Sequence, residues 1–113
     1  MHEVSIMSQT LEIATENAQQ QGANQIHRLK MRIGEMSGVV PEALNFAFDV
    51  VTEGTIAQGA KLEIEIVPVI CYCLHCQIEF QPPDLFYECP QCDRLSNKII
   101  AGREIELTSL EIS

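Results

Sequence analysis

The chain has 113 residues, 46% of them hydrophobic, and it carries 16 acidic against 7 basic side chains, for a net charge of −9. This length fits one domain, or one domain with a small insertion. The acidic balance argues against a nucleic-acid partner held through phosphate contacts and against adsorption to an anionic membrane. Since no apolar run reaches the length of a membrane span, we expect a soluble chain.

The first helix and the strand that follows it are predicted from apolar periodicity. Near the N-terminus, apolar side chains recur at the three- and four-residue steps of one helix face: Val4, Met7, Leu11, Ala14 and Ala18. Gly22 is the expected stop of this helix. In the strand, apolar and basic residues alternate, which predicts a half-buried strand with a basic outer face: Leu29, Met31 and Ile33 against Arg28, Lys30 and Arg32.

A second helix and two further strands are predicted after this strand. Pro41 suits the first turn of the helix and Gly54 its end, and its apolar face consists of Ala43, Leu44, Ala47, Phe48 and Val51. The next strand ends before Pro68 and alternates Leu62, Ile64 and Ile66 with Lys61, Glu63 and Glu65. The last strand follows Gly102 and alternates Ile105 and Leu107 with Glu104, Glu106 and Thr108. Its alternation slips at Ser109 and Leu110, which indicates a bulge.

These elements predict an α+β fold in which two helices pack on a three-stranded sheet. Because opposite charges pair favourably across strands, the basic strand should lie beside at least one acidic strand. The segment of residues 70–100 is inserted before the last strand, so we expect a discontinuous domain of residues 1–69 and 101–113 and a small domain of residues 70–100. Pro68 and Gly102 are candidate hinges. Strand exchange between two chains is conceivable, but we expect a monomer or a weak homodimer.

The strongest motif is a double pair of cysteines in the inserted segment. The pairs are twelve residues apart, enough for a short hairpin between them, and read Cys73-Leu74-His75-Cys76 and Cys89-Pro90-Gln91-Cys92. Two Cys-x-x-Cys turns supply four thiolates for a closed tetrahedral site, whose commonest occupant is zinc. A closed site has no open coordination position, so this zinc would be structural. It would also supply the folding energy that so small a segment lacks.

Other uses of these cysteines stay open. Two disulfides would suit an oxidising compartment, but the chain opens without a secretion pattern, so we expect the reducing cytoplasm. Four cysteines also hold a single iron in rubredoxin-like electron carriers. The fifth cysteine, Cys71, is expected to be a buried or free thiol and not a ligand. Asp93 follows the last cysteine, where related zinc ribbons often have Gly, and Asp tolerates a positive φ better than most residues.

No catalytic constellation stands out, so we expect no enzyme. His27 lies near the start of the first strand, on its apolar side, and is interpreted as a strand-end or satisfied core histidine. His75 lies inside the first cysteine turn and should be exposed. The glycines match no phosphate-binding loop.

The N-terminus is a second candidate metal site. Because His2 is too large for removal of the initiator residue, Met1 should stay. Its α-amine, the His2 amide nitrogen and the His2 imidazole can then close two chelate rings, and the Glu3 amide or carboxylate can supply a fourth donor. Planar, nitrogen-rich coordination suits Ni(II) or Cu(II). A solvated histidine without a metal is the alternative reading of the same residues.

Several segments together resemble the HypA (HybF) family, the nickel metallochaperones of NiFe-hydrogenase maturation, over the whole chain. They are residues 1–5, 33–42 and 44–48 and the two cysteine pairs. The resemblance implies that His2 is a nickel ligand, with the Met1 amine and the Glu3 backbone as co-ligands. It also implies that four cysteines are the zinc ligands: Cys73, Cys76, Cys89 and Cys92.

The resemblance further implies how such a chain works. Zn(II) would be a structural ion and Ni(II) a cargo, bound at the N-terminus and passed to the large-subunit precursor of a NiFe-hydrogenase. The partner would be a HypB-type GTPase, and in some organisms the same protein also serves urease. The alternative function is a zinc-ribbon docking module without a nickel site, and the importance of His2 distinguishes the two.

Overall fold

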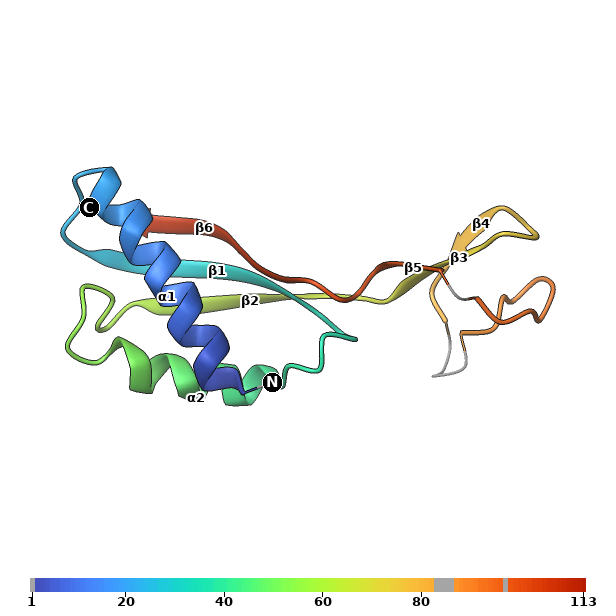
Figure 1. The fold of residues 1–113 in the computed structure, drawn as a ribbon, viewed down its shortest axis with the longest axis horizontal. Coiled ribbons are helices and arrows are strands. Elements are labelled where there is room, and N and C mark those ends of the chain that lie inside the picture. Colours follow the sequence, from blue (N-terminus) through green and yellow to red (C-terminus); the bar gives the residue numbers. More distant parts are fainter. Residues whose placement is uncertain (1, 83–86, 97) are drawn as a thin grey trace.

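The computed structural model describes residues 2–82, 87–96 and 98–113 and shows an elongated molecule measuring 54 × 25 × 17 Å (Figure 1). One end holds two helices and a three-stranded sheet, and the other holds a second small sheet and the cysteines. The expected α+β fold is confirmed. Within the described ranges, we find no helix with the length and apolar character needed to span a membrane.

The larger sheet is mixed and has the strand order β2-β1-β6. The central strand β1 (Ile26–Gly34) pairs in parallel with β2 (Lys61–Val67) and antiparallel with β6 (Ile105–Ile112). Helix α2 (Pro41–Thr52) is the crossover that a parallel pair requires. Helix α1 (Glu3–Gln20) packs against α2 and contacts β1 and β6. The expected bulge is present, because the register of β6 against β1 skips Thr108.

Ion pairs between neighbouring strands cover the outer face of this sheet. Arg28 and Arg32 each pair with acidic side chains of both flanking strands, whereas Lys30 pairs, among the described residues, with β2 alone. Arg28 pairs with Glu63 and, at 3.6 Å, with Glu111; Lys30 pairs with Glu65 at 3.6 Å; Arg32 pairs with Glu65 at 3.0 Å and with Glu106 at 3.7 Å. Because all these groups are partly exposed, each pair contributes little stability. Their pattern favours the observed strand register.

The inner face of the sheet and the two helices enclose the main core. Its largest fully buried side chains are Met7, Ile26, Leu29, Met31, Ile33 and Leu44. The prediction for Val4 was wrong, since this side chain is 50% exposed whereas Ile6 is only 6% exposed. Because α1 packs against both α2 and the sheet, its buried face is wider than one stripe, and Val4 lies at the edge of that face in the first turn.

His27 is the second correction. It is exposed, and its Nε2 lies 2.7 Å from Ser113 Oγ. The strand-end interpretation is confirmed, but the core interpretation was wrong. The register of β1 against β6 shifts between Ile26 and Arg28, so Ile26 takes the buried place that strict alternation gives to position 27.

The smaller sheet has the strand order β4-β3-β5, with both pairings antiparallel. Its strands are β3 (Ile70–Cys73), β4 (Ile78–Phe80) and β5 (Lys98–Ala101). The sequence did not predict this sheet, because strands of three or four residues are too short to show a period. The hairpin expected between the cysteine pairs falls partly on residues 83–86, outside the described residues. The domain limits at residues 69/70 and 100/101 stay a prediction.

Three chain segments meet between the two ends and form a waist, defined here as residues 34–36, 67–69 and 102–104. Met36 N–H donates to the Gly102 carbonyl at 2.7 Å, and Val69 N–H donates to the Glu35 carboxylate at 2.9 Å. A Cβ at Gly34 would lie 2.1 Å from the Gly102 backbone, so only glycine fits. Pro68 and Gly102 both lie at this waist, and their role as hinges stays a prediction.

Candidate metal centres

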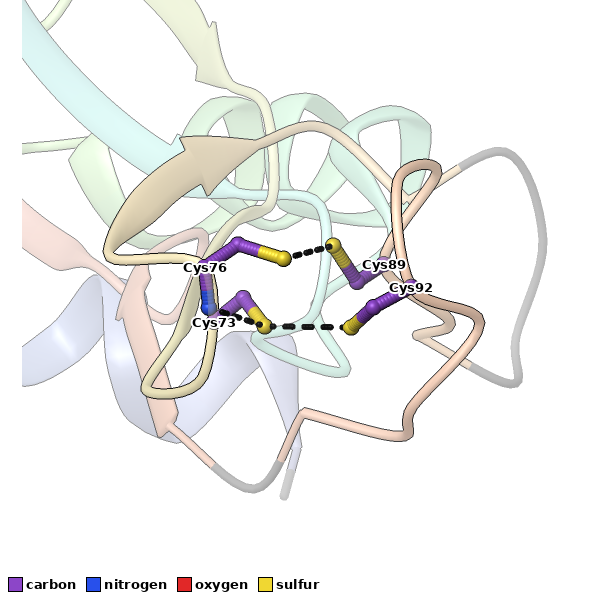
Figure 2. Close-up of side chains that lie close together, drawn as sticks. All are labelled: Cys73, Cys76, Cys89 and Cys92. Carbon is purple, nitrogen blue, oxygen red and sulfur yellow. Dashed lines mark hydrogen bonds between the residues drawn. The ribbon is translucent and has the colours of Figure 1, made fainter.

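The four paired cysteines come together in one cluster, and Figure 2 shows their sulfurs pointing toward one another. All four Sγ atoms lie within 4.8 Å of one another. The Sγ atoms of Cys73 and Cys92 are 3.6 Å apart, and those of Cys76 and Cys89 are 4.0 Å apart. In a tetrahedral site with Zn–S bonds of about 2.3 Å, the sulfurs are roughly 3.8 Å apart. The donor set therefore fits a metal such as zinc.

Both cysteine turns follow the same backbone path. The N–H of Gln77 donates to the carbonyl of Cys73 at 2.8 Å, and the N–H of Asp93 donates to that of Cys89 at 2.9 Å. Gln77 and Asp93, each directly after a pair, have φ values of 57° and 59°. The expectation that Asp93 takes a positive φ is confirmed. The repeated turn explains how two separate segments present their sulfurs in the same way.

The pKa values of two cluster thiols, Cys73 and Cys76, are shifted in opposite directions. The Cys76 backbone N–H, which lies 3.4 Å from Cys73 Sγ, lowers the pKa of Cys73 to about 7. The pKa of Cys76 is raised to about 12, chiefly through its hydrogen bonding with the Cys92 thiol. Four sulfurs this close cannot all be thiolates unless a positive ion neutralises their charge. Metal binding would therefore release protons.

Cys71 lies outside the four-sulfur cluster. It is fully buried in β3 and packs in a small core with Cys73, Phe80 and Cys89. Desolvation raises the pKa of its thiol, which makes the group unreactive. The prediction of a buried thiol is confirmed. His75, in the first cysteine turn, is exposed as expected.

The second candidate site lies at the start of α1. His2 is exposed and has an extended backbone (φ −83°, ψ 130°) at the N-cap position of α1. Its carbonyl accepts the Ile6 N–H at 3.2 Å. Met1, the expected source of the amine ligand, lies outside the described residues. The nickel role of His2, Met1 and Glu3 stays a prediction.

The Glu3 side chain makes a contact that sequence reasoning missed. Its Oε2 accepts the backbone N–H of Val40 at 3.2 Å, and this hydrogen bond is the main reason that the pKa of Glu3 is lowered. Val40 is the N-cap residue of α2, so the Glu3 carboxylate joins the starts of the two helices. In Figure 1 the start of α1 lies beside the start of α2. Because the partners are 37 positions apart in the sequence, no local sequence signal indicates the contact.

The chain is similar to known proteins over almost its whole length. The sequence profile of a family described as "Hydrogenase/urease nickel incorporation, metallochaperone, hypA" matches residues 1–112. Hydrogenase maturation factor HypA of a Picosynechococcus species is 58% identical over 112 residues, covering 99% of both chains. The protein of the same name from Acidithiobacillus ferrooxidans is 43% identical with the same coverage.

Two solved structures resemble the fold closely. The solution structure of the Ni metallochaperone HypA from Helicobacter pylori is 30% identical, covers 99% of this chain and 97% of its own, and superposes with a TM-score of 0.68. A second solution structure, described as HypA protein, is 31% identical, covers 100% and 97% of the two chains and has a TM-score of 0.73.

Proposed function

The chain belongs to the HypA family of hydrogenase and urease nickel-incorporation metallochaperones, and from this membership we propose that it binds Ni(II) at its N-terminus and delivers it to the large-subunit precursor of a NiFe-hydrogenase. The observation that supports this site most is the exposed, extended His2 at the N-cap of α1. Its imidazole and its amide nitrogen belong to the same residue, and Met1, which carries the amine, directly precedes that residue in the sequence.

The start of α1 suits a planar nitrogen-rich site. The first N–H groups of any α-helix have no acceptor within the helix. The Glu3 amide can therefore lose its proton and bind the metal without breaking a helical hydrogen bond. Two deprotonated amides carry two negative charges and cancel the charge of Ni(II). The loaded site is then nearly neutral, and the positive end of the α1 dipole does not repel it. A metal held only by neutral donors would be repelled there.

The Glu3 contact helps to choose between the two candidates for the fourth ligand, the Glu3 backbone amide and the Glu3 carboxylate. Because the carboxylate already accepts the Val40 N–H, we assign the co-ligand role to the Glu3 backbone and a positioning role to its side chain. The carboxylate would fix the first turn of α1 against α2 and so hold His2 at one place on the surface.

For the cysteine cluster we propose Zn(II), held by Cys73, Cys76, Cys89 and Cys92. The sulfur separations fit it, and four thiolates without an open position give a structural ion, which would fix the two cysteine turns relative to each other. The iron alternative makes a different prediction, because a ferric tetrathiolate protein is red and a zinc protein is colourless.

The proposed mechanism is binding and hand-off in the cytoplasm, with no catalytic residue. Protonation of the His2 imidazole or of the amides would loosen the nickel, and so would a change in the N-terminal backbone when a partner docks. The proposed partners are a HypB-type GTPase and the hydrogenase precursor.

A surface for the GTPase is available on α2. Phe46 and Val50 lie one turn apart on its outer side and are 72% and 52% exposed. Acidic residues flank this apolar pair, namely Glu42, Asp49 and Glu53. This face belongs to the helix whose N-cap residue, Val40, donates to Glu3, so a protein docked on it would lie close to the proposed nickel site.

A comparison of two exposed histidines tests the proposal. Ni(II) is titrated into zinc-loaded protein, into His2→Ala and into the matched control His75→Ala. We expect the native chain and His75→Ala to bind about one Ni(II) per chain with the diamagnetic signature of a planar site, and His2→Ala to lose it. Equal nickel binding by both variants would instead favour a zinc-ribbon docking module without an N-terminal nickel site.

A further inference from the structure

A groove of about 460 Å³ lies beside the cysteine turns at the small end of the molecule. It is lined by residues 72–75, from β3 and the first turn, and by residues 94–96, which follow the second turn. The volume is within the range of about 300–1,000 Å³ that is usual for small binding sites. The groove therefore has room for a few side chains of a partner and not for a whole folded domain.

Two exposed leucines stand at the groove, one from each lining segment. Leu74 is 64% exposed and Leu95 is 68% exposed. Neither belongs to the small core of this end. Apolar side chains exposed on both lining segments of a groove can pack against an apolar side chain of a partner.

The groove has a basic side chain, Arg94, although the chain as a whole is acidic. The protein as a whole carries −9, but the ionisable side chains that line the groove, apart from Tyr72 and Cys73, are those of His75 and Arg94. Lys98 Nζ lies 5.5 Å from the centre of the Tyr72 ring and adds a second cation at this edge. The acidic Glu88 and Asp93 are close in sequence but do not line the groove.

Neither Arg94 nor Lys98 is paired with an acidic side chain among the residues that the structure describes. Every ion pair found between described residues uses a basic residue of β1 on the larger sheet, and none uses Arg94 or Lys98. Ser96, in contrast, is already engaged, because its Oγ donates to the Tyr72 carbonyl at 2.7 Å. Ser96 therefore shapes the groove, and Arg94 is the side chain suited to receive a ligand.

We propose that this groove binds a short, extended segment of another protein that places a carboxylate next to an apolar side chain. The Arg94 guanidinium can hold the carboxylate through two parallel hydrogen bonds, while Leu74 and Leu95 cover the apolar side chain. The cysteine turns set the distance between these leucines, so the site exists only in the metal-loaded protein. The inference is independent of the nickel site, since neither His2 nor α1 takes part.

The test uses zinc-loaded full-length protein and two labelled peptides, acetyl-Leu-Asp-Leu-Glu-amide and its basic counterpart acetyl-Leu-Lys-Leu-Lys-amide. Fluorescence anisotropy measures affinity, and amide chemical shifts locate the peptide. We expect the acidic peptide to shift residues 72–75 and 94–98 and the basic peptide to shift none. Arg94→Glu should weaken binding of the acidic peptide about tenfold or more, since it replaces an attraction by a repulsion. Leu95→Ser should weaken it about fivefold through lost apolar contact.

Arg103→Glu is the matched control, since Arg103 is exposed and outside the groove. It changes the net charge by the same amount and should leave the affinity within about twofold. Metal content and circular dichroism confirm that each variant is folded. Arg94→Glu should also gain affinity for the basic peptide, a change that unfolding cannot imitate.

Three results would overturn the proposal. The acidic peptide could shift no residue of the groove, or Arg94→Glu and Arg103→Glu could weaken binding equally, which would mean general charge attraction. Alternatively, the protein could self-associate in sedimentation velocity in a way that Leu95→Ser abolishes, which would make a second copy of this chain the occupant.

Discussion

The two ends of the molecule are stabilised by different means. Among the described residues, the larger end buries fourteen hydrophobic side chains, whereas the smaller end buries Phe80 and three cysteines. Apolar burial can hold the first end together. In the second, two of the four buried side chains, Cys73 and Cys89, are proposed metal ligands, so the site and the core share residues. The smaller end should therefore depend on its metal, and the larger end should not.

Loss of the metal gives the largest expected effect. Cys73→Ser should abolish stoichiometric zinc binding and unfold the smaller end, because structural zinc contributes on the order of 10 kcal/mol of folding free energy in small domains. Amide exchange should become fast in β3, β4 and β5 and stay slow in β1. The control is Cys71→Ala, which removes a buried thiol outside the cluster and should keep one zinc per chain. Slow exchange throughout Cys73→Ser would show that the smaller end does not need its metal.

A core substitution should produce the opposite result. Leu44 is fully buried in α2, and Leu44→Ala should lower the free energy of unfolding of the larger end by about 2–5 kcal/mol. Chemical denaturation followed by circular dichroism measures the loss. Zinc content should not change, and a variant that also releases zinc would mean that the two ends fold as one unit.

The waist offers a way to disturb both ends at once. A Cβ at Gly34 would overlap the Gly102 backbone, so Gly34→Ala should destabilise the fold by about 1–3 kcal/mol. Chemical shifts should change on both sides of the waist, in β1 and in β3. Gly22→Ala is the comparison, since a Cβ there meets no neighbouring atom and only the positive φ of 73° opposes it. Its shift changes should stay near the end of α1.

The smallest effect is expected at the N-terminus and depends on pH. The pKa of Glu3 is lowered below its ordinary value of 4.5, mainly by the Val40 N–H. A carboxyl whose pKa is lower in the folded state stabilises that state above the unfolded pKa, and this contribution is lost as the pH falls through the folded pKa. Glu3→Gln should therefore be less stable than the native chain at pH 7 and equal to it well below pH 4. A difference that persists at low pH would assign the effect to packing.

Sequence periodicity predicted the larger end well because its elements are long enough to show a period. The alternation of Leu29, Met31 and Ile33 gave β1 and its basic face, and the slip near Ser109 gave the bulge in β6. Alternation failed at His27, where the register shift against β6 interrupts it. The spacing of the four cysteines likewise predicted their cluster, since each short turn largely fixes its own geometry.

What the sequence did not predict depends on contacts between distant residues. The Glu3–Val40 and Glu35–Val69 hydrogen bonds join residues more than thirty positions apart, and neither partner type marks such a contact. The groove beside the cysteine turns depends on the smaller sheet, whose strands are too short to show a pattern. Leu74, Arg94 and Leu95 are unremarkable in sequence and become a candidate site only when the two turns are placed side by side.

The central claim is that the free N-terminus is the nickel site, and one measurement tests it most directly. Ni(II) is titrated into zinc-loaded protein with its native N-terminus and into the same protein with one alanine added before Met1. The addition moves the amine away from His2 and alters no side chain. We predict that the native chain binds about one Ni(II) with the diamagnetic spectrum of a planar complex and that the extended chain does not. Equal binding by the two proteins, or no binding by either, would contradict the claim.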